Sequence, residues 1–286
     1  MTTIALLGTG LLGHAIGQRL LAQGLTLRVW NRTATRISTL VSAGAIPIEQ
    51  LSESTQGCDA VITVLKDGPA TSDVVHALDD LRGRCLIPMG TMGIRESRDL
   101  ATLMNSRGGT YLEAPVLGSR PEALNGSLLV MAGGDPDVFK QHQHLLSHVS
   151  AQPVLVGPVG SGAATKLALN QLIASMTHAF SLSLRLVQQA DVPIETFMEI
   201  LRPSALYAPT YDKKLKRMLE QHYSDPNFST TLLRKDLTLF LQEAMQSGLN
   251  PEGLSGLSTL LAQATARDLD ELDYCSLHEL TQSIRT

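Results

Sequence analysis

A lysine and an asparagine four residues apart are the first pair in this sequence with side chains and spacing suited to chemistry. Lys166 and Asn170 lie in the run 163–190, which carries apolar residues at helical spacing and contains no glycine or proline. Residues four apart share one face of a helix. Either the lysine extends to solvent, or its ammonium donates a proton to a substrate oxygen, a role that burial supports by lowering a lysine pKa. The spacing leaves both explanations open.

The stretch Gly8-Thr9-Gly10-Leu11-Leu12-Gly13 has the glycine spacing of a dinucleotide-binding turn. It follows a short apolar run and opens an amphipathic one, which is the strand–turn–helix context that the motif requires. Gly8 permits the sharp turn, Gly10 lets a pyrophosphate approach the backbone, and Gly13 lets helix and strand pack closely. The first N–H groups of the helix then face the phosphates. We therefore predict a dinucleotide site here, the alternative being a glycine cluster that only admits a helix.

Residues 31–33 indicate which dinucleotide is bound. An acidic residue at the end of the second strand would bind the ribose 2′-hydroxyl of NAD, but the chain has Asn31-Arg32-Thr33. Arg32 offers a guanidinium and Thr33 a hydroxyl to phosphate oxygens. The pattern favours NADP(H), unless Arg32 is only a solvated loop charge. Leu65 ends a later strand and Lys66 follows it, and both are predicted to lie near the cofactor cleft, where Lys66 is either a functional ion or a loop charge.

The elements that must position these residues change in kind along the chain. Strand-like runs first alternate with helix-like ones, which predicts βαβ units and a mainly parallel sheet. After residue 162 only helical patterns follow. We predict an α/β Rossmann-type doubly wound domain over residues 1–160 and an all-helical second domain over 161–286, joined by a long inter-domain helix. The predicted strands are 4–7, 25–30, 60–65, 85–88, 110–113 and 128–132, and the predicted helices are 11–23, 70–81, 95–106, 163–190, 194–201, 211–221, 232–247 and 253–269.

Composition narrows the classes of function. The 286 residues are 43% hydrophobic and 17% charged with a net charge of −4, which fits a soluble globular protein and argues against general nucleic-acid affinity. The sequence contains no run of about 18 apolar residues, so we predict no membrane span. The first residues also lack the basic start of a secretory signal. Cys58, Cys85 and Cys275 have neither metal nor disulfide spacing. We expect them to be buried in a reducing cytoplasm, and we predict no metal site.

Six segments, in order along the chain, resemble the β-hydroxyacid dehydrogenases, a group that includes 3-hydroxyisobutyrate dehydrogenases and glyoxylate/succinic semialdehyde reductases. The resemblance covers nearly the whole chain, and the combination is far more specific than the glycine motif alone. It implies a Rossmann domain joined by a long helix to a helical domain. The segments are 8–13, Asn31-Arg32-Thr33, Met89-Gly90-Thr91, Glu113-Ala114-Pro115-Val116-Leu117-Gly118-Ser119, Gly160-x-Gly162-x-x-x-Lys166-x-x-x-Asn170 and Leu233-Arg234-Lys235-Asp236-Leu237.

The resemblance implies roles for individual residues. Lys166 would be the catalytic lysine, Asn170 would help to hold the substrate, and Thr91 would line the nicotinamide side of the cofactor cleft. Lys235 would reach towards cofactor or substrate, with Asp236 beside it in the substrate site, unless the two form an exposed charged pair. The substrate loop would consist of Pro115, Val116, Leu117, Gly118 and Ser119.

One position of that loop departs from the family pattern. The family usually has a serine after Pro-Val that helps to bind the substrate carboxylate, whereas this chain has Leu117, which cannot donate a hydrogen bond. Either Ser119 and backbone N–H groups replace it, or the substrate is more apolar. The implied activity is NADPH-dependent reduction of a small aldehyde or ketone by hydride transfer, with Lys166 as proton donor. The family also implies a homodimer or tetramer formed through the helical domain.

Two other functions are compatible with this architecture. Imine reductases and reductive aminases usually lack a lysine at the position of Lys166, so its presence favours carbonyl chemistry, while Leu117 weakens the link to an acid substrate. A non-catalytic NADP-binding module would bind the cofactor without turnover, and the complete pair of Lys166 and Asn170 argues against it.

Overall fold

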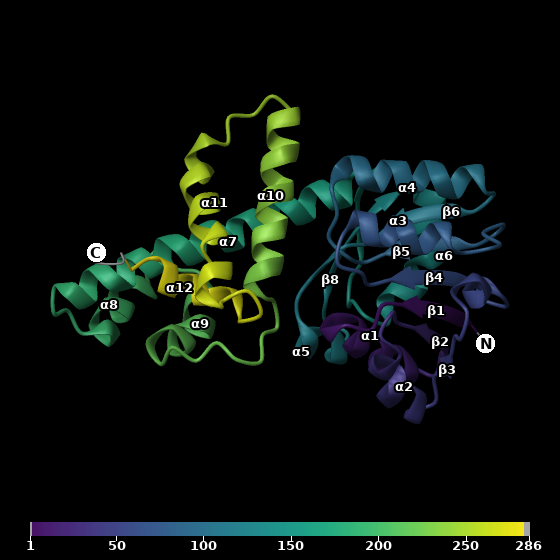
Figure 1. Ribbon diagram of the computed structural model, residues 1–286, viewed down its shortest axis with the longest axis horizontal. Coiled ribbons are helices and arrows are strands. Elements are labelled where there is room, and N and C mark those ends of the chain that lie inside the picture. The colour runs from purple at the N-terminus through teal and green to yellow at the C-terminus, as the bar shows by residue number, and fades with distance from the viewer. Residues whose placement is uncertain (1, 283–286) are drawn as a thin grey trace. The chain divides into compact units, whose positions relative to one another are not determined.

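The computed structural model describes residues 2–282, which form two compact units that divide between Leu167 and Ala168. The division falls inside one helix, α7 (Ser161–Gln189), shown in teal to green in Figure 1. The domain boundary predicted from the sequence, after residue 160, lies at the start of the same helix.

The first unit is built on a mainly parallel sheet, as predicted. Its first strands are in the order β3-β2-β1-β4-β5-β6, which is the order of a doubly wound dinucleotide-binding sheet, and neighbours among them pair in parallel. Strand β8 continues the sheet antiparallel to β6 and β7 and parallel to β9. The strands are β1 (Thr3–Leu7), β2 (Thr26–Trp30), β3 (Ile46–Pro47), β4 (Ala60–Thr63), β5 (Cys85–Pro88), β6 (Thr110–Glu113), β7 (Val116–Leu117), β8 (Leu129–Gly134) and β9 (Val154–Gly157).

Side-chain alternation along β1 explains why both faces of this sheet are covered. Ile4 and Leu6 are buried in a core with α1 and α6, whereas Ala5 and Leu7 are buried in a second core with α3 and α4. Because successive strand side chains point to opposite faces, a strand buried on both faces is a continuous apolar run. Figure 1 shows α3 and α4 along one face and α1 on the other. The helices are α1 (Leu11–Ala22), α2 (Ser38–Ser42), α3 (Gly68–His76), α4 (Ile94–Ser106), α5 (Arg120–Asn125) and α6 (Pro136–Ser147).

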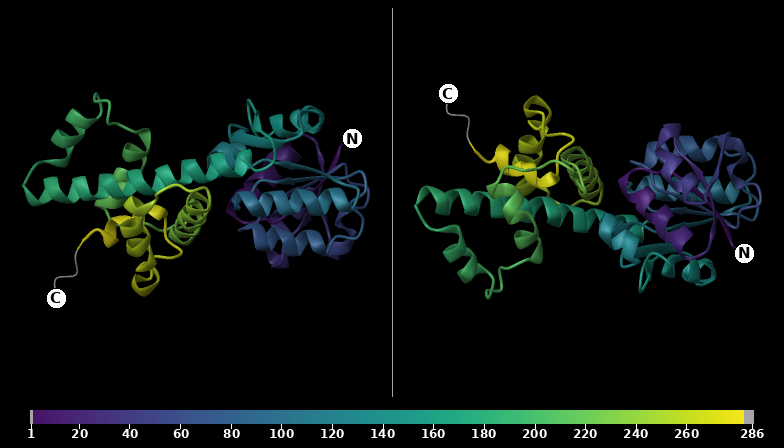
Figure 2. Two further views of the ribbon diagram at one scale, coloured as in Figure 1. Left: turned by 90° about the horizontal axis from the view of Figure 1, so that it is seen from above. Right: turned by 90° about the horizontal axis from the view of Figure 1, so that it is seen from below.

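The second unit is helical, which confirms the prediction. Within residues 168–282 the only β-type pairing is an isolated bridge between Ser229 and Asp273. Ala174 of α7 packs in one core with α10 and α11, and Phe180 packs in another with α8 and α9. Figure 2 shows α8 and α9 on one side of α7 and α10 to α12 on the other. The helices are α8 (Ile194–Leu201), α9 (Pro209–Leu219), α10 (Thr230–Gln246), α11 (Ser255–Ala262) and α12 (Leu277–Leu280). None of the described helices is long and apolar enough to cross a membrane.

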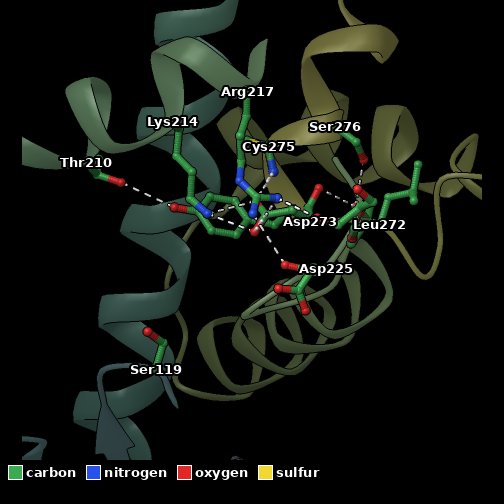
Figure 3. A network of polar contacts seen from close by, with 12 residues as sticks. Ser119, Thr210, Lys214, Arg217, Asp225, Leu272, Asp273, Cys275 and Ser276 are labelled. Atoms are coloured by element: carbon green, nitrogen blue, oxygen red, sulfur yellow. Dashed lines mark hydrogen bonds and ion pairs between the residues drawn. The ribbon is translucent and has the colours of Figure 1, made fainter. Parts of the chain in front are cut away.

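A buried ion pair fixes the last segment of the second unit (Figure 3). The carboxylate of Asp273 has no exposed surface and accepts hydrogen bonds of 2.8 Å from Lys214 Nζ and of 3.2 Å from the Cys275 N–H. The Lys214 ammonium also lies 4.5 Å from the centroid of the Tyr274 ring, a cation–π distance. A buried charge without such partners is strongly destabilising, so this cluster holds the segment against α9.

The differences from the predicted elements are short segments, the ends of predicted elements and one longer helix, α6. The helix predicted over 253–269 consists of three pieces, 252–254, α11 and 265–267, and Asp268 has a φ of 54°, the left-handed conformation that ends helices. The helix predicted over 70–81 ends at His76. Strands β3, β7 and β9 and helices α2 and α5 lie outside the predicted ranges, because short segments have little periodicity to identify them. Helix α6, with 12 residues, also lies outside the predicted ranges, and its length does not explain this.

Candidate active site

The carboxyl ends of β1, β2, β4 and β5 bring four sequence-predicted segments to one edge of the sheet. Gly8 follows β1, Asn31 follows β2, Val64 follows β4 and Met89 follows β5. Backbone hydrogen bonds of 2.8–2.9 Å join Gly8, Val64 and Met89 to neighbouring strands. In open parallel sheets, ligands bind outside this edge where the strand order reverses. Here the order reverses between β1 and β4, beside the glycine motif.

The glycine motif has the geometry that its sequence predicts. Gly8 has a φ of 101°, and a Cβ there would lie 2.4 Å from the Val64 carbonyl oxygen. A Cβ on Gly13 would lie 2.1 Å from the Gly8 carbonyl oxygen. Gly10 differs, because no atom lies within 4 Å of the position of its Cβ. Gly8 and Gly13 therefore serve the fold, while Gly10 leaves open space at the uncapped N-terminus of α1, which fits a pyrophosphate.

Asn31 has a structural role in the loop after β2. Its Oδ1 accepts a hydrogen bond of 3.0 Å from the Thr9 N–H, and its Nδ2 donates one of 3.1 Å to the Thr33 carbonyl. The Thr9 hydroxyl donates to the Arg36 carbonyl at 3.3 Å. The loop is thereby joined to the glycine motif, and it carries the exposed side chains of Arg32 and Thr33.

The ends of β4 and β5 approach each other closely. A Cβ on Gly90 would lie 2.4 Å from the Leu65 carbonyl oxygen, so only glycine fits there. Leu65 and Thr91 are half-buried at this edge, and Lys66 is exposed. Asp67, the neighbour of Lys66, caps α3 by accepting a hydrogen bond of 2.9 Å from its first turn. Capping of α3 therefore explains the acidic residue of the Lys66-Asp67 pair.

The predicted substrate loop presents an apolar side chain where a serine is usual. Leu117 is half-buried at the end of β7, next to the buried Val116. The Ser119 hydroxyl donates to Glu122 Oε2 at 2.6 Å, and the Ser119 N–H donates to the same oxygen at 2.8 Å. This capping box starts α5. The Ser119 hydroxyl is thus already engaged, and it would have to leave Glu122 to bind a substrate carboxylate.

The helix that carries Lys166 begins beside a buried carboxylate. Glu113, at the end of β6, is 2% exposed, and its Oε1 accepts hydrogen bonds of 2.7 Å from the N–H groups of Gly160 and Gly162. The Ser97 hydroxyl donates to its Oε2. Burial raises the pKa of the Glu113 carboxyl, and these hydrogen bonds oppose that rise. The sequence contained this residue only as the first of a family segment. Its one local signal is an acidic residue closing an apolar strand.

Lys166 is half-buried on α7, four residues before Asn170. In the second unit, Asn170 Nδ2 donates a hydrogen bond of 2.5 Å to Asp236 Oδ2, and Lys235 Nζ lies 2.6 Å from Asp236 Oδ1. Asn170 and Asp236 are buried, so Lys235 and Asp236 are not the exposed charged pair that was the alternative. Asn170 Oδ1 is a buried acceptor for which the described residues provide no hydrogen-bond donor.

The free cysteines, Cys58, Cys85 and Cys275, are all buried, as predicted. Among the described residues, no group of three or more histidine, cysteine, aspartate or glutamate side chains is placed to hold a metal ion.

Comparisons with known proteins agree with this geometry. Residues 3–157 match the family model of the NAD binding domain of 6-phosphogluconate dehydrogenase, and residues 160–281 match that of the NAD-binding domain of NADP-dependent 3-hydroxyisobutyrate dehydrogenase. The chain is 28% identical to glyoxylate/succinic semialdehyde reductase 1 of Arabidopsis thaliana, over 99% of both chains. It is 30% identical to the cytokine-like nuclear factor N-PAC of Xenopus tropicalis, over 82% of this chain and 45% of that protein.

Solved structures share the fold. A 3-hydroxyisobutyrate dehydrogenase of Mycobacterium tuberculosis has a TM-score of 0.88 at 23% identity, over 99% of this chain and 100% of that chain. An imine reductase from Pseudomonas sp. has a TM-score of 0.67 at 21% identity, over 98% of this chain and 99% of that chain. The fold and the family models together define an oxidoreductase with a nicotinamide cofactor. The chain belongs to the β-hydroxyacid dehydrogenase family, whose members act on CH–OH groups.

We expect Gly10→Ala to weaken cofactor binding without destabilising the protein. The added methyl group meets no protein atom but occupies the space at the N-terminus of α1. The dissociation constant of the nicotinamide cofactor, measured by fluorescence titration, should rise about tenfold or more, equivalent to about 1.4 kcal/mol. Thermal unfolding should be unchanged. Gly13→Ala is the matched control and should lower Tm, because its Cβ would lie 2.1 Å from the Gly8 carbonyl oxygen. Unchanged affinity in Gly10→Ala would contradict this placement of the pyrophosphate.

Proposed function

We propose that this protein reduces a small aldehyde or ketone with NADPH. The observation that carries the proposal is a half-buried lysine one helical turn before a buried asparagine, on the helix that starts at the Gly160-x-Gly162 segment. Full-length similarity to glyoxylate/succinic semialdehyde reductase 1 of Arabidopsis thaliana supports this class of reaction.

The chain's own residues suggest how the reaction would proceed. When bound, NADPH supplies the hydride. Lys166 would direct its ammonium at the carbonyl oxygen, where negative charge grows during hydride transfer, and would donate the proton that completes the alcohol. Asn170 Oδ1, which is buried and lacks a donor among the described residues, would accept a hydrogen bond from a substrate hydroxyl. Thr91, in the loop after β5, would line the nicotinamide side of the site, and Asp236 would hold the Asn170 amide.

Replacing Lys166 tests the proposed proton donor. We expect Lys166→Met to lower kcat by about 100-fold or more, since general acid catalysis contributes about 10²–10⁴-fold, while NADPH still binds. Turnover is followed by loss of NADPH absorbance on a panel of aldehydes and ketones, with and without carboxylate groups. Wild-type turnover in this variant would contradict the assignment.

The same panel, repeated with added amine, distinguishes the second candidate function. Two observations support imine reduction as this second candidate. They are Leu117 in the substrate loop and the fold shared with an imine reductase. A carbonyl reductase consumes NADPH without amine, whereas an imine reductase or reductive aminase depends on it. A non-catalytic module would bind NADPH and consume none in either arm.

NADPH is the form of the cofactor that the loop after β2 favours. Asn31 is held by Thr9 and Thr33 and offers no carboxylate to a ribose 2′-hydroxyl. Arg32 and Thr33 are exposed on the same loop, where a guanidinium and a hydroxyl suit a 2′-phosphate.

Replacing Arg32 should therefore affect NADPH alone. We expect Arg32→Ala to raise the dissociation constant of NADPH by about tenfold or more, the size of a charged hydrogen bond, and to leave that of NADH unchanged. Arg95→Ala, which removes an exposed arginine on α4, is the control. Equal weakening of both cofactors, or of neither, would count against a 2′-phosphate site.

Two features of the substrate loop favour a substrate with an apolar group at that position. Leu117 provides no hydrogen-bond donor, and the Ser119 hydroxyl is engaged by Glu122. In the panel, this arrangement favours carbonyl compounds with a short aliphatic group over those with a carboxylate there. The alternative way of holding an acid is through backbone N–H groups of this loop, although Pro115 has none and the Ser119 N–H already donates to Glu122.

The second unit is proposed to form a homodimer or tetramer. It exposes large apolar side chains, including Leu186 at 69% on α7, Ile200 at 69% on α8 and Leu206 at 77%. Contiguous exposed apolar patches mark surfaces that another chain covers, and we propose that these side chains belong to such a patch. We expect at least a dimer in light scattering at micromolar concentration, and a shift towards monomer in Leu186→Glu. A monomeric wild-type protein would contradict this proposal.

The three buried, free cysteines fit the reducing cytoplasm, where we place the protein.

A further inference from the structure

A buried carboxylate lies where three elements of the first unit meet. Glu113 closes β6, and its side chain receives hydrogen bonds from Ser97 in the first turn of α4 and from Gly160 and Gly162 at the start of α7. The residue is 2% exposed, so water cannot substitute for these partners. A single side chain thus joins the strand, the helix after β5 and the helix that carries Lys166.

Glycines make this close approach possible. A Cβ on Gly133 would lie 2.1 Å from Glu113 Oε1, and a Cβ on Gly162 would lie 3.1 Å from the same oxygen and 2.5 Å from the Met131 carbonyl oxygen. Gly160 has a φ of 99°. The absence of side chains lets the N–H groups of Gly160, just before α7, and of Gly162, in its first turn, converge on one carboxylate oxygen. The Gly160-x-Gly162 segment therefore has a physical function, which is to receive Glu113.

The charge of Glu113 also complements α7. This helix has no acidic residue in its first turn. The first N–H groups of a helix lack partners and carry partial positive charge, so a carboxylate near them is favourable. Glu113 supplies that carboxylate from another element, which fixes the helix start to the sheet.

On its other side, the network reaches the loop after β5. The buried Ser97 hydroxyl lies 2.8 Å from the Tyr111 hydroxyl, which in turn lies 3.8 Å from Met92 Sδ. Met92 directly follows Thr91, the residue expected at the nicotinamide side of the cofactor. The carboxylate therefore ties the position of this loop to that of the first turn of α7.

We propose that Glu113 is a positioning residue that sets Lys166 relative to the loop holding Thr91. Lys166 lies four residues after Gly162, about one helical turn. A displacement of about 1 Å in a reacting group can lower a rate by about 100-fold. Glu113 touches neither substrate nor cofactor in this proposal, which rests on the proposed role of Lys166 as proton donor.

Two substitutions separate the effect of the side-chain length of Glu113 from the effect of its charge. Glu113→Gln keeps the length and one oxygen for Gly160 and Gly162, and its amide N–H can donate to the Ser97 hydroxyl. Glu113→Asp keeps the charge but is one methylene too short. We expect Glu113→Asp to lower kcat by about 100-fold with unchanged dissociation constant for NADPH, and Glu113→Gln to stay close to wild type. Wild-type kcat in Glu113→Asp, or equal losses in kcat and in NADPH affinity, would overturn the proposal.

Amide hydrogen exchange at Gly160 and Gly162 provides a readout that does not depend on catalysis. Exchange should accelerate in Glu113→Asp and remain slow in both Glu113→Gln and Lys166→Met. If Lys166→Met keeps its turnover, the proposed function fails, while the exchange data still report whether Glu113 anchors α7. Accelerated exchange together with undiminished kcat in Glu113→Asp would show an anchor that does not position the lysine.

If Glu113→Asp does not fold, Ser97→Ala tests the other half of the network. This change removes the donor from α4 and leaves both glycine N–H donors in place. We expect a smaller loss of kcat at unchanged NADPH affinity. A wild-type kcat would overturn the link between the two segments.

Discussion

In the first unit, backbone lies against backbone so closely at the carboxyl edge of the sheet that no Cβ fits between. Gly8 approaches Val64, and Gly90 approaches Leu65, with 2.4 Å between the position of a Cβ and the facing carbonyl oxygen in each case. These approaches bring the ends of β1, β4 and β5 together and leave the first turn of α1 facing the edge. The segments after β1, β4 and β5 that are predicted to bind the cofactor are therefore held at one edge.

The helices of the first unit differ in whether a protein side chain binds the N–H groups at their N-terminus. The N-termini of α3, α4, α5 and α6 are satisfied by side chains, from Asp67, Glu96, Ser119 with Glu122, and Asp135. The N-terminus of α1 has glycine as its cap and receives no side chain. That of α7 receives Glu113 from a different element. Unpaired N–H groups at a helix start favour an anion. At α7 a protein carboxylate meets this demand, whereas the N-terminus of α1 has no side-chain cap, which supports the proposal that the cofactor pyrophosphate binds there.

The features that could be predicted from the sequence are those whose cause is local. The turn between β1 and α1, the strand–helix alternation and the long helix each have a periodicity or a turn signal within a few residues, and the structure confirms all three. The role of Glu113 has no local signal, because Gly160 lies 47 residues away and the carboxylate meets it only after the sheet has formed. The same limit applies to the contact between Asn170 and Asp236, which are 66 residues apart.

That contact in the second unit also determines which atom of Asn170 can serve a ligand. An ionised carboxylate only accepts hydrogen bonds, so the amide nitrogen must be the atom that faces Asp236. The amide oxygen then points elsewhere, and an acceptor buried without a donor costs about 1–3 kcal/mol. A substrate hydroxyl or another donor would remove that cost, whereas a purely apolar group would not. With Lys235 beside Asp236, this cluster supports the proposal of a ligand that carries a hydrogen-bond donor, and it does so independently of the half-buried Leu117.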